Sequence, residues 1–138
     1  MGQRRRAREV AVQVLFHMEY SPGDFQEAFD QVCAHFKVPP ETREFAGILV
    51  KGVCDNREEI DSIIREASDN WRLERMSRVD RNILRIGSFE VIYLKEVPAK
   101  VAIDEAVELG KRFGSKESGA FINGVLDNVF IKVSSSEK

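Results

Sequence analysis

The chain has few cysteines and no long apolar run, which argues against a disulfide-rich secreted protein and against a membrane-spanning protein. Cys33 and Cys54 are the only cysteines among 138 residues, too few for a disulfide framework and typical of a reducing compartment. No apolar stretch is long enough to span a bilayer, and the first residues lack the apolar core of a signal peptide. We therefore expect a cytoplasmic protein that does not associate with a membrane.

The chain also lacks the motifs of several enzyme classes. It has no glycine-rich phosphate-binding loop and no Gly-x-Ser-x-Gly turn, and His17 and His35 are its only imidazoles. The one close pair of possible metal ligands is Cys33 and His35, which point in different directions if they lie two residues apart on a helix. Cys33 also belongs to an apolar stripe, which favours a buried thiol. We expect no catalytic activity, no cofactor and no metal site.

Net charge is close to zero, so the field of the whole molecule does not attract a polyanion. The 21 basic and 23 acidic residues leave a charge of −2. The local exception is the N-terminus, where four of the first eight residues are arginine: Arg4, Arg5, Arg6 and Arg8. Positive charge at the start of a helix opposes the helix dipole. A bound nucleic acid would relieve this conflict, and we favour that interpretation over a solvated N-terminus without a partner.

Helical spacing places three of these arginines together. Arg4 and Arg8 lie one turn apart, and Arg5 and Arg8 are three residues apart. We expect their common face to point away from the apolar stripe of the same helix, with Arg6 off that face. On this surface the arginines would follow a phosphate backbone.

Apolar residues recur with helical spacing along the whole chain, and no segment shows the sustained alternation of a strand. The pattern predicts an all-α protein of about seven helices in two small packed bundles. The segment 79–92 is apolar on nearly all sides, which predicts a central, buried helix. The apolar stripes cover residues 7–18, 25–36, 45–53, 60–67, 79–92, 102–113 and 121–130.

Polar and glycine residues indicate where these helices begin and end. Asn56 and Ser77 are each followed three residues later by an acidic residue, which predicts helix N-caps at both positions. Gly114 suits a left-handed C-cap, with Ser115 starting the last helix. The linker 68–76 around Trp71 is the best candidate for a boundary within a single domain of residues 1–138. It would separate an N-terminal subdomain of about 1–70 from a C-terminal one of about 71–138.

Two further features admit a functional and a structural interpretation. The acidic residues Glu74, Asp80 and Glu90 either are ordinary cap and surface charges, which spacing favours, or form an edge that meets a basic protein. In the segment 121–127, Gly124 costs helix stability and predicts close helix packing. Phe121 in the same segment is expected to pack in the core, with stacking on an unpaired base as the alternative.

Several motifs together resemble those of the NusB family of transcription antitermination factors, in register over essentially the whole chain. The last two are the most specific, although position 104 is Asp where the family often has Asn. The segments are Arg5-Arg6-Ala7-Arg8-Glu9, Arg81-Asn82-Ile83-Leu84-Arg85, Val97-Pro98-Ala99-Lys100-Val101-Ala102-Ile103-Asp104-Glu105-Ala106 and Phe121-Ile122-Asn123-Gly124-Val125-Leu126-Asp127.

The resemblance implies a function and a set of contact residues. NusB proteins bind the boxA element of nascent ribosomal RNA together with NusE, a ribosomal protein, and join the RNA polymerase antitermination complex. By matching positions, the resemblance implies RNA contacts at Arg4, Arg5, Arg6, Arg8, Glu117 and Phe121. It implies contacts with the protein partner at Phe16, Glu74 and Asp80.

Two alternatives remain open at this stage. Similar domains precede RNA cytosine methyltransferases, so the chain could be an RNA-binding accessory domain of that kind. It could also be a protein-only adaptor, since homodimers of some family members hide the RNA surface. A protein that gained no affinity for boxA RNA on binding its ribosomal partner would favour the adaptor.

Overall fold

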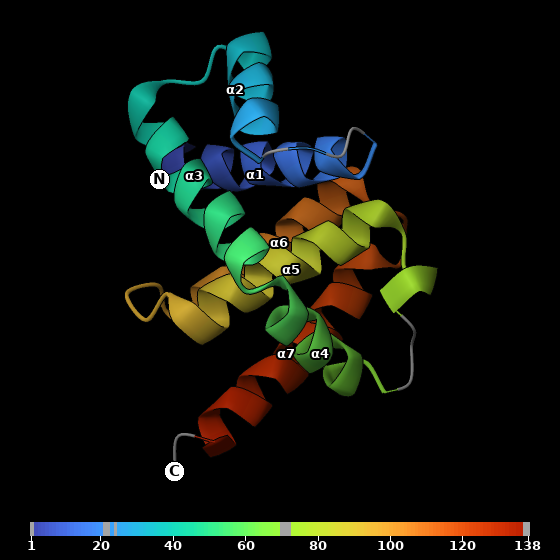
Figure 1. Cartoon of the computed structure of the whole chain (residues 1–138). Coiled ribbons are helices and arrows are strands. Elements are labelled where there is room, and N and C mark those ends of the chain that lie inside the picture. The colour runs from blue at the N-terminus through green and yellow to red at the C-terminus, as the bar shows by residue number, and fades with distance from the viewer. Residues whose placement is uncertain (1, 21–22, 24, 70–72, 137–138) are drawn as a thin grey trace. The chain divides into compact units, whose positions relative to one another are not determined.

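The computed structural model describes residues 2–20, 23, 25–69 and 73–136. All regular structure in these ranges is helical, so the expectation of an all-α fold with seven α-helices is confirmed (Figure 1). The helices are α1 (Gly2–Tyr20), α2 (Phe25–Phe36), α3 (Pro40–Asp55), α4 (Arg57–Ala67), the 3-10 helix η1 (Leu73–Arg75), α5 (Arg78–Tyr93), α6 (Ala99–Phe113) and α7 (Ser118–Ser136). None of the described helices is long and apolar enough to cross a membrane.

The chain divides into two compact units, residues 1–55 and 56–138. This boundary lies before α4, whereas the sequence predicted it in the linker around Trp71, a residue outside the described ranges. The reason is that α4 packs against α5 and α7. The side-chain amide of Asn128 on α7 donates a hydrogen bond to the carbonyl oxygen of Ala67 at 2.9 Å, which joins the last residue of α4 to α7.

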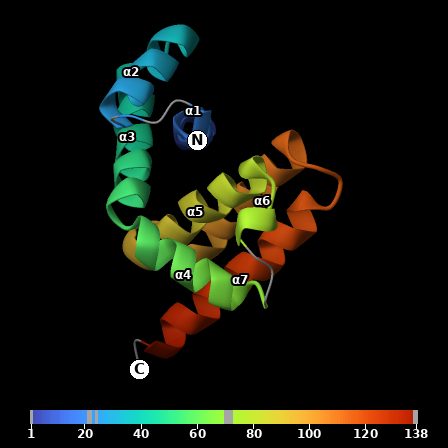
Figure 2. The same cartoon turned by 45° about the vertical axis from the view of Figure 1, so that its right-hand side comes forward.

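In the N-terminal unit, α1 packs against both α2 and α3, and Figure 2 looks almost along α1 with the other two helices beside it. The apolar stripes of the sequence form the shared core, as expected from their spacing. Val14 of α1 and Leu49 of α3 are fully buried. Two stripe residues differ from this pattern, because Phe36 and Ile48 are 42% and 46% exposed.

In the C-terminal unit, α5 contacts α4, α6 and α7. Ten consecutive residues, 82–91, are buried, so the prediction of a central helix is confirmed. The predicted cap at its start is also confirmed, because the Ser77 hydroxyl accepts a hydrogen bond from the backbone N–H of Asp80 at 3.0 Å. This bond satisfies one of the free N–H groups at the start of the helix.

The predicted start of α4 after Asn56 is confirmed, although the capping bond is absent, and the predictions for Gly114 and Ser115 are wrong. Asn56 is the N-cap residue of α4, but its side chain makes no capping hydrogen bond. Gly114 has φ −96° and ψ −162°, which is extended rather than left-handed backbone, and α7 begins at Ser118 rather than Ser115. Glycine suits position 114 for a steric reason, since an added Cβ would lie 2.6 Å from the Cβ of Ser118 and collide with its hydroxyl. That hydroxyl accepts a hydrogen bond from the backbone N–H of Ser115.

The expected role of Gly124 in helix packing is also wrong. The residue is exposed, and an added Cβ would have no neighbour within 4 Å. Gly87 in α5 does have the role that the sequence assigned to Gly124, because an added Cβ would lie 2.8 Å from Cδ1 of the buried Leu126.

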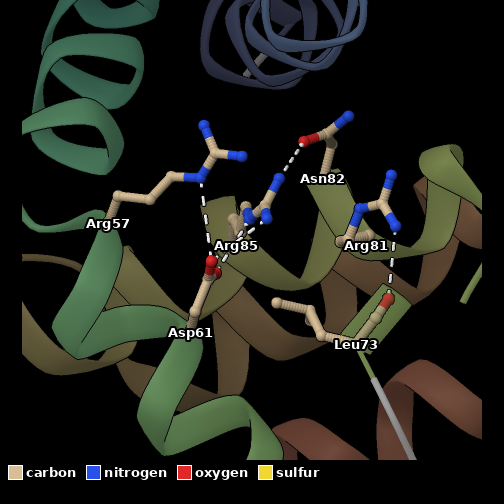
Figure 3. A network of polar contacts seen from close by, with 6 residues as sticks. All are labelled: Arg57, Asp61, Leu73, Arg81, Asn82 and Arg85. Carbon is tan, nitrogen blue, oxygen red and sulfur yellow. Dashed lines mark hydrogen bonds and ion pairs between the residues drawn. The ribbon is translucent and has the colours of Figure 1, made fainter. Parts of the chain in front are cut away.

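A buried ion pair joins α4 to α5 (Figure 3). The Arg85 guanidinium donates to both carboxylate oxygens of Asp61, at 2.9 and 3.1 Å, and the two residues are 4% and 8% exposed. Arg85 also donates to the side-chain oxygen of Asn82 at 3.1 Å. The exposed Arg57 lies 3.7 Å from the same carboxylate, and Arg81 donates to the carbonyl oxygen of Leu73 at 3.2 Å. The network therefore connects α4, η1 and α5.

Removing one member of the buried pair should strongly destabilise the chain. We expect Asp61→Ala to lower the free energy of unfolding by roughly 3–5 kcal/mol, because it leaves the Arg85 charge buried without its partner. Arg57→Ala should cost about 1 kcal/mol or less, since the Arg57 guanidinium is exposed to solvent and the Asp61 carboxylate keeps its bonds to Arg85. Urea denaturation followed by circular dichroism measures both. Equal losses in the two variants would show that the buried pair has no special role.

The two helical glycines should respond oppositely to alanine. Gly124→Ala should raise the free energy of unfolding by about 0.5–1 kcal/mol, because the helix gains a better former and the Cβ meets open space. Gly87→Ala should lower it by roughly 1–3 kcal/mol, because Leu126 must move within a packed core. Thermal melts of both variants test the contrast, and a stabilised Gly87→Ala would refute the close approach.

Candidate nucleic-acid and protein interface

The arginine cluster of α1 is divided between two neighbouring helices. Arg4 and Arg8 lie over the same ring, that of Phe45 on α3, with guanidinium carbons 4.5 and 5.6 Å from its centroid. Arg8 is only 4% exposed, so the expectation that it shares an outward face with Arg4 and Arg5 is wrong for this residue. The reason is the position of Phe45, whose ring attracts a cation on the side of α1 that faces α3.

Arg5 and Arg6 complete the cluster. Arg5 is exposed, as is Arg4. Arg6 is half-buried on a different side of α1, where its guanidinium lies 5.7 Å from the ring centroid of Phe36 on α2 and 3.4 Å from the Glu9 carboxylate. The expected separation of Arg6 from Arg4 is thus present. The cluster presents exposed cations at Arg4 and Arg5, and its other members are held by rings of α2 and α3.

The C-terminal unit contains a hollow of about 300 Å³ where the start of α5 meets the loop before α7. It gathers Asp80, Glu117 and Phe121, three residues to which the sequence had given two different roles. Glu74 is exposed on the adjoining helix η1 and does not line the hollow. The lining residues are Arg75, Met76, Ser77, Asp80, Ser115, Glu117 and Phe121.

Arg75, Met76 and Ser115 are members of this hollow that the sequence did not single out. No local pattern marks them, because the hollow forms only when the segment before α5 meets the loop after α6. Only Ser115 had a signal in the sequence that could have pointed to it. It lies two residues before Glu117, which matches a position of the family's RNA surface. Phe121 is half-buried here. One part of its ring packs in the protein, as core packing predicts, and another part is accessible, as base stacking requires.

Two carboxylates, Asp80 and Glu117, and one guanidinium, Arg75, line the hollow, which we call the acidic hollow. One carboxylate oxygen of Asp80 is buried without a hydrogen-bond partner among the described residues. The Ser115 hydroxyl donates to the carboxylate of the exposed Glu117 at 3.5 Å. Both carboxylates lie at the N-terminal ends of helices, α5 and α7, where the helix dipoles favour negative charge. The hollow can therefore accept hydrogen bonds from a cationic side chain or from the amino group of a base.

Phe16, the third expected partner contact, belongs to the N-terminal unit. Its ring lies edge-on to that of Tyr20, with centroids 5.2 Å apart. It lines a hollow between α1 and α2, whereas Glu74 and Asp80 belong to the C-terminal unit.

The Cys33 thiol is buried, and the described His, Cys, Asp and Glu side chains form no cluster. Cys33 is 2% exposed, and burial raises the pKa of its thiol, which keeps it protonated and unreactive at neutral pH. Among the described residues, no three His, Cys, Asp or Glu side chains gather as they would around a metal ion.

Comparison with known proteins identifies the family. The NusB family model matches residues 5–130. The transcription antitermination protein NusB of Desulfatibacillum aliphaticivorans is 46% identical over 138 residues, which cover 100% of this chain and 96% of that protein. NusB of T. maritima superposes with a TM-score of 0.88 at 33% identity, over 97% of this chain and 94% of the other. A chain from a crystal structure of antitermination factors NusB and NusE with dsRNA gives a TM-score of 0.87 at 31% identity, over 96% and 98%.

These matches span nearly the whole sequence and the whole fold. They include the arginine cluster from Arg5 onward and the α7 segment that contains Phe121. The chain therefore belongs to the NusB family.

Proposed function

We propose that this chain is a cytoplasmic transcription antitermination factor without catalytic activity. It binds the boxA element of nascent ribosomal RNA together with the ribosomal protein NusE and joins the RNA polymerase antitermination complex. The observation that carries the proposal is the exposed pair Arg4 and Arg5 at the start of α1, in a chain of the NusB family. Support for both partners comes from the related structure, which holds NusB and NusE with RNA.

The charge distribution explains why RNA would be bound locally and weakly by the chain alone. With a net charge of −2, the molecule offers a polyanion no general attraction. Arg4 and Arg5 can contact phosphates directly, whereas Arg8 is buried over Phe45 and supports α1 against α3. Single-stranded RNA also offers unstacked bases, and the half-buried ring of Phe121 at the start of α7 can receive one.

The acidic hollow suits a basic protein partner. Ribosomal proteins are rich in lysine and arginine, and a lysine or arginine of the partner would pair with the Asp80 carboxylate, which lines this hollow. Glu117 and the exposed Glu74 add negative charge around the same end of α5. A partner bound there would bring its own positive charge to the RNA. The RNA would then contact two linked proteins at once, so each protein would strengthen the binding of the other.

Arginine substitutions test the RNA surface through salt. Each phosphate contact to a single strand contributes about −0.7 to the slope of log K against log salt. We expect Arg4→Ala with Arg5→Ala to flatten the slope for a boxA oligonucleotide by about 1.4 if each contacts one phosphate. Fluorescence anisotropy at several salt concentrations, with the ribosomal partner present, measures this.

The matched control for this experiment removes two exposed cations elsewhere, Lys51 and Lys100. It changes the net charge by the same amount and should leave the slope as in the unmodified chain. A slope that stayed unchanged in the arginine variant, or that changed equally in both, would remove the cluster from the RNA site.

Neutralising Asp80 tests the protein surface. We expect Asp80→Asn to weaken binding of the ribosomal partner by roughly tenfold or more, because a charge-assisted hydrogen bond is lost. Asp104→Asn on the exposed side of α6 is the control and should bind normally. Isothermal titration calorimetry without RNA separates this effect from the arginine surface. Unchanged affinity in Asp80→Asn would place the partner elsewhere.

Three results would favour an alternative to the proposed function. A complex with the ribosomal partner that gained no affinity for boxA RNA would indicate a protein-only adaptor. Methyl transfer to RNA by the chain would indicate the enzyme-associated class. A homodimer that dissociated when RNA was added would show that self-association covers the RNA surface.

A further inference from the structure

The N-terminal unit has a hollow of its own, formed by α1 and α2, with a volume of about 400 Å³. This size is within the usual range of ligand sites. Its aromatic residues are unusually accessible, since Tyr20 is 59% and Phe36 42% exposed. The lining residues are Gln13, Phe16, His17, Tyr20, Gln31, Val32, His35 and Phe36.

The hollow adjoins the arginine cluster. Gln13, His17 and Tyr20 follow one face of α1 with spacings of four and three residues, and Arg6 lies two turns before Gln13 on that face. The Arg6 guanidinium lies 5.7 Å from the centroid of Phe36, which forms the α2 wall of the hollow. A strand of RNA that followed the arginines would therefore reach the hollow at Phe36.

The lining chemistry distinguishes this hollow from the acidic one in the other unit. None of its eight lining residues is a carboxylate, so nothing in the wall repels a phosphate. The rings are arranged in two edge-on pairs, Phe16 with Tyr20 at 5.2 Å and His35 with Phe36 at 4.8 Å. Gln13 adds an amide that can both donate and accept hydrogen bonds at a base edge.

We infer that the α1–α2 hollow binds an unpaired base of the RNA, stacked on the ring of Phe36 or Tyr20. The inference rests on the proposed RNA-binding function and assigns it a second contact, in which the cations hold the backbone and the rings hold a base. Aromatic stacking of this kind tolerates any base because each has a π-face. The competing occupant is an apolar side chain of the protein partner, which the family resemblance would bring to Phe16 in the same hollow. The neighbouring arginines and the lack of carboxylates in the lining favour RNA.

Phe36→Ala tests the inference. Loss of a base-stacking ring should weaken binding of a single-stranded boxA oligonucleotide by roughly 5- to 150-fold. The salt slope should stay as in the unmodified chain, since no charge is removed. The control is Phe130→Ala on α7, which removes a ring that is 44% exposed and lies outside the hollow. Equal affinity of Phe36→Ala and Phe130→Ala would overturn the inference.

A second measurement locates the base directly. RNA that carries 4-thiouridine should crosslink to Tyr20, His35 or Phe36 of the complete chain, as identified by mass spectrometry. Crosslinks confined to other residues would overturn the inference. Because the crosslinking experiment uses the unmodified chain, it tests the inference even if Phe36→Ala fails to fold.

The outcomes separate this inference from the proposed function. Failure of the unmodified chain with its ribosomal partner to bind boxA RNA would refute the function itself. A salt slope that responds to Arg4 and Arg5 while Phe36→Ala binds normally would refute only the base site. If Phe36→Ala weakened binding of the ribosomal protein and left RNA affinity intact, the occupant would be protein and the inference would be wrong.

Discussion

The buried ion pair of Arg85 and Asp61 constrains the architecture of the C-terminal unit. Two charges removed from water are tolerated only if each is satisfied by the other, and here both carboxylate oxygens receive a hydrogen bond from one guanidinium. This requirement holds α4 against α5, and it explains why α4 belongs with the helices that follow it. Ser77 caps the start of the same helix, and the acidic hollow forms at that end of α5.

A second constraint acts on α1, because positive charge at the N-terminal end of a helix is unfavourable and four arginines lie there. Rings of neighbouring helices supply part of the compensation, with Phe45 below Arg4 and Arg8 and Phe36 below Arg6. Because successive helical residues are rotated by about 100°, a run of arginines cannot all face one partner. The cluster is consequently divided into a supporting residue, exposed cations and a cation beside the α1–α2 hollow.

The sequence predicted much of the fold, and family resemblance identified the residues of interest. Helical periodicity located all seven helices because it depends on residues only three and four apart. Predictions failed where distant segments decide the outcome. Burial of Arg8 depends on Phe45, and the exposure of Gly124 depends on which side of α7 meets its neighbours.

By itself, the sequence determined the helical class, the central position of α5 and the presence of a local cationic cluster, because each follows from short-range spacing and composition. Only the tertiary structure decided which arginines face solvent, and that Asp80, Glu117 and Phe121 share one hollow. It alone placed the exposed rings of Tyr20 and Phe36 in another. The physical reason is that a hollow is formed by side chains from separate helices, and their meeting depends on packing between elements rather than on the pattern within any one of them.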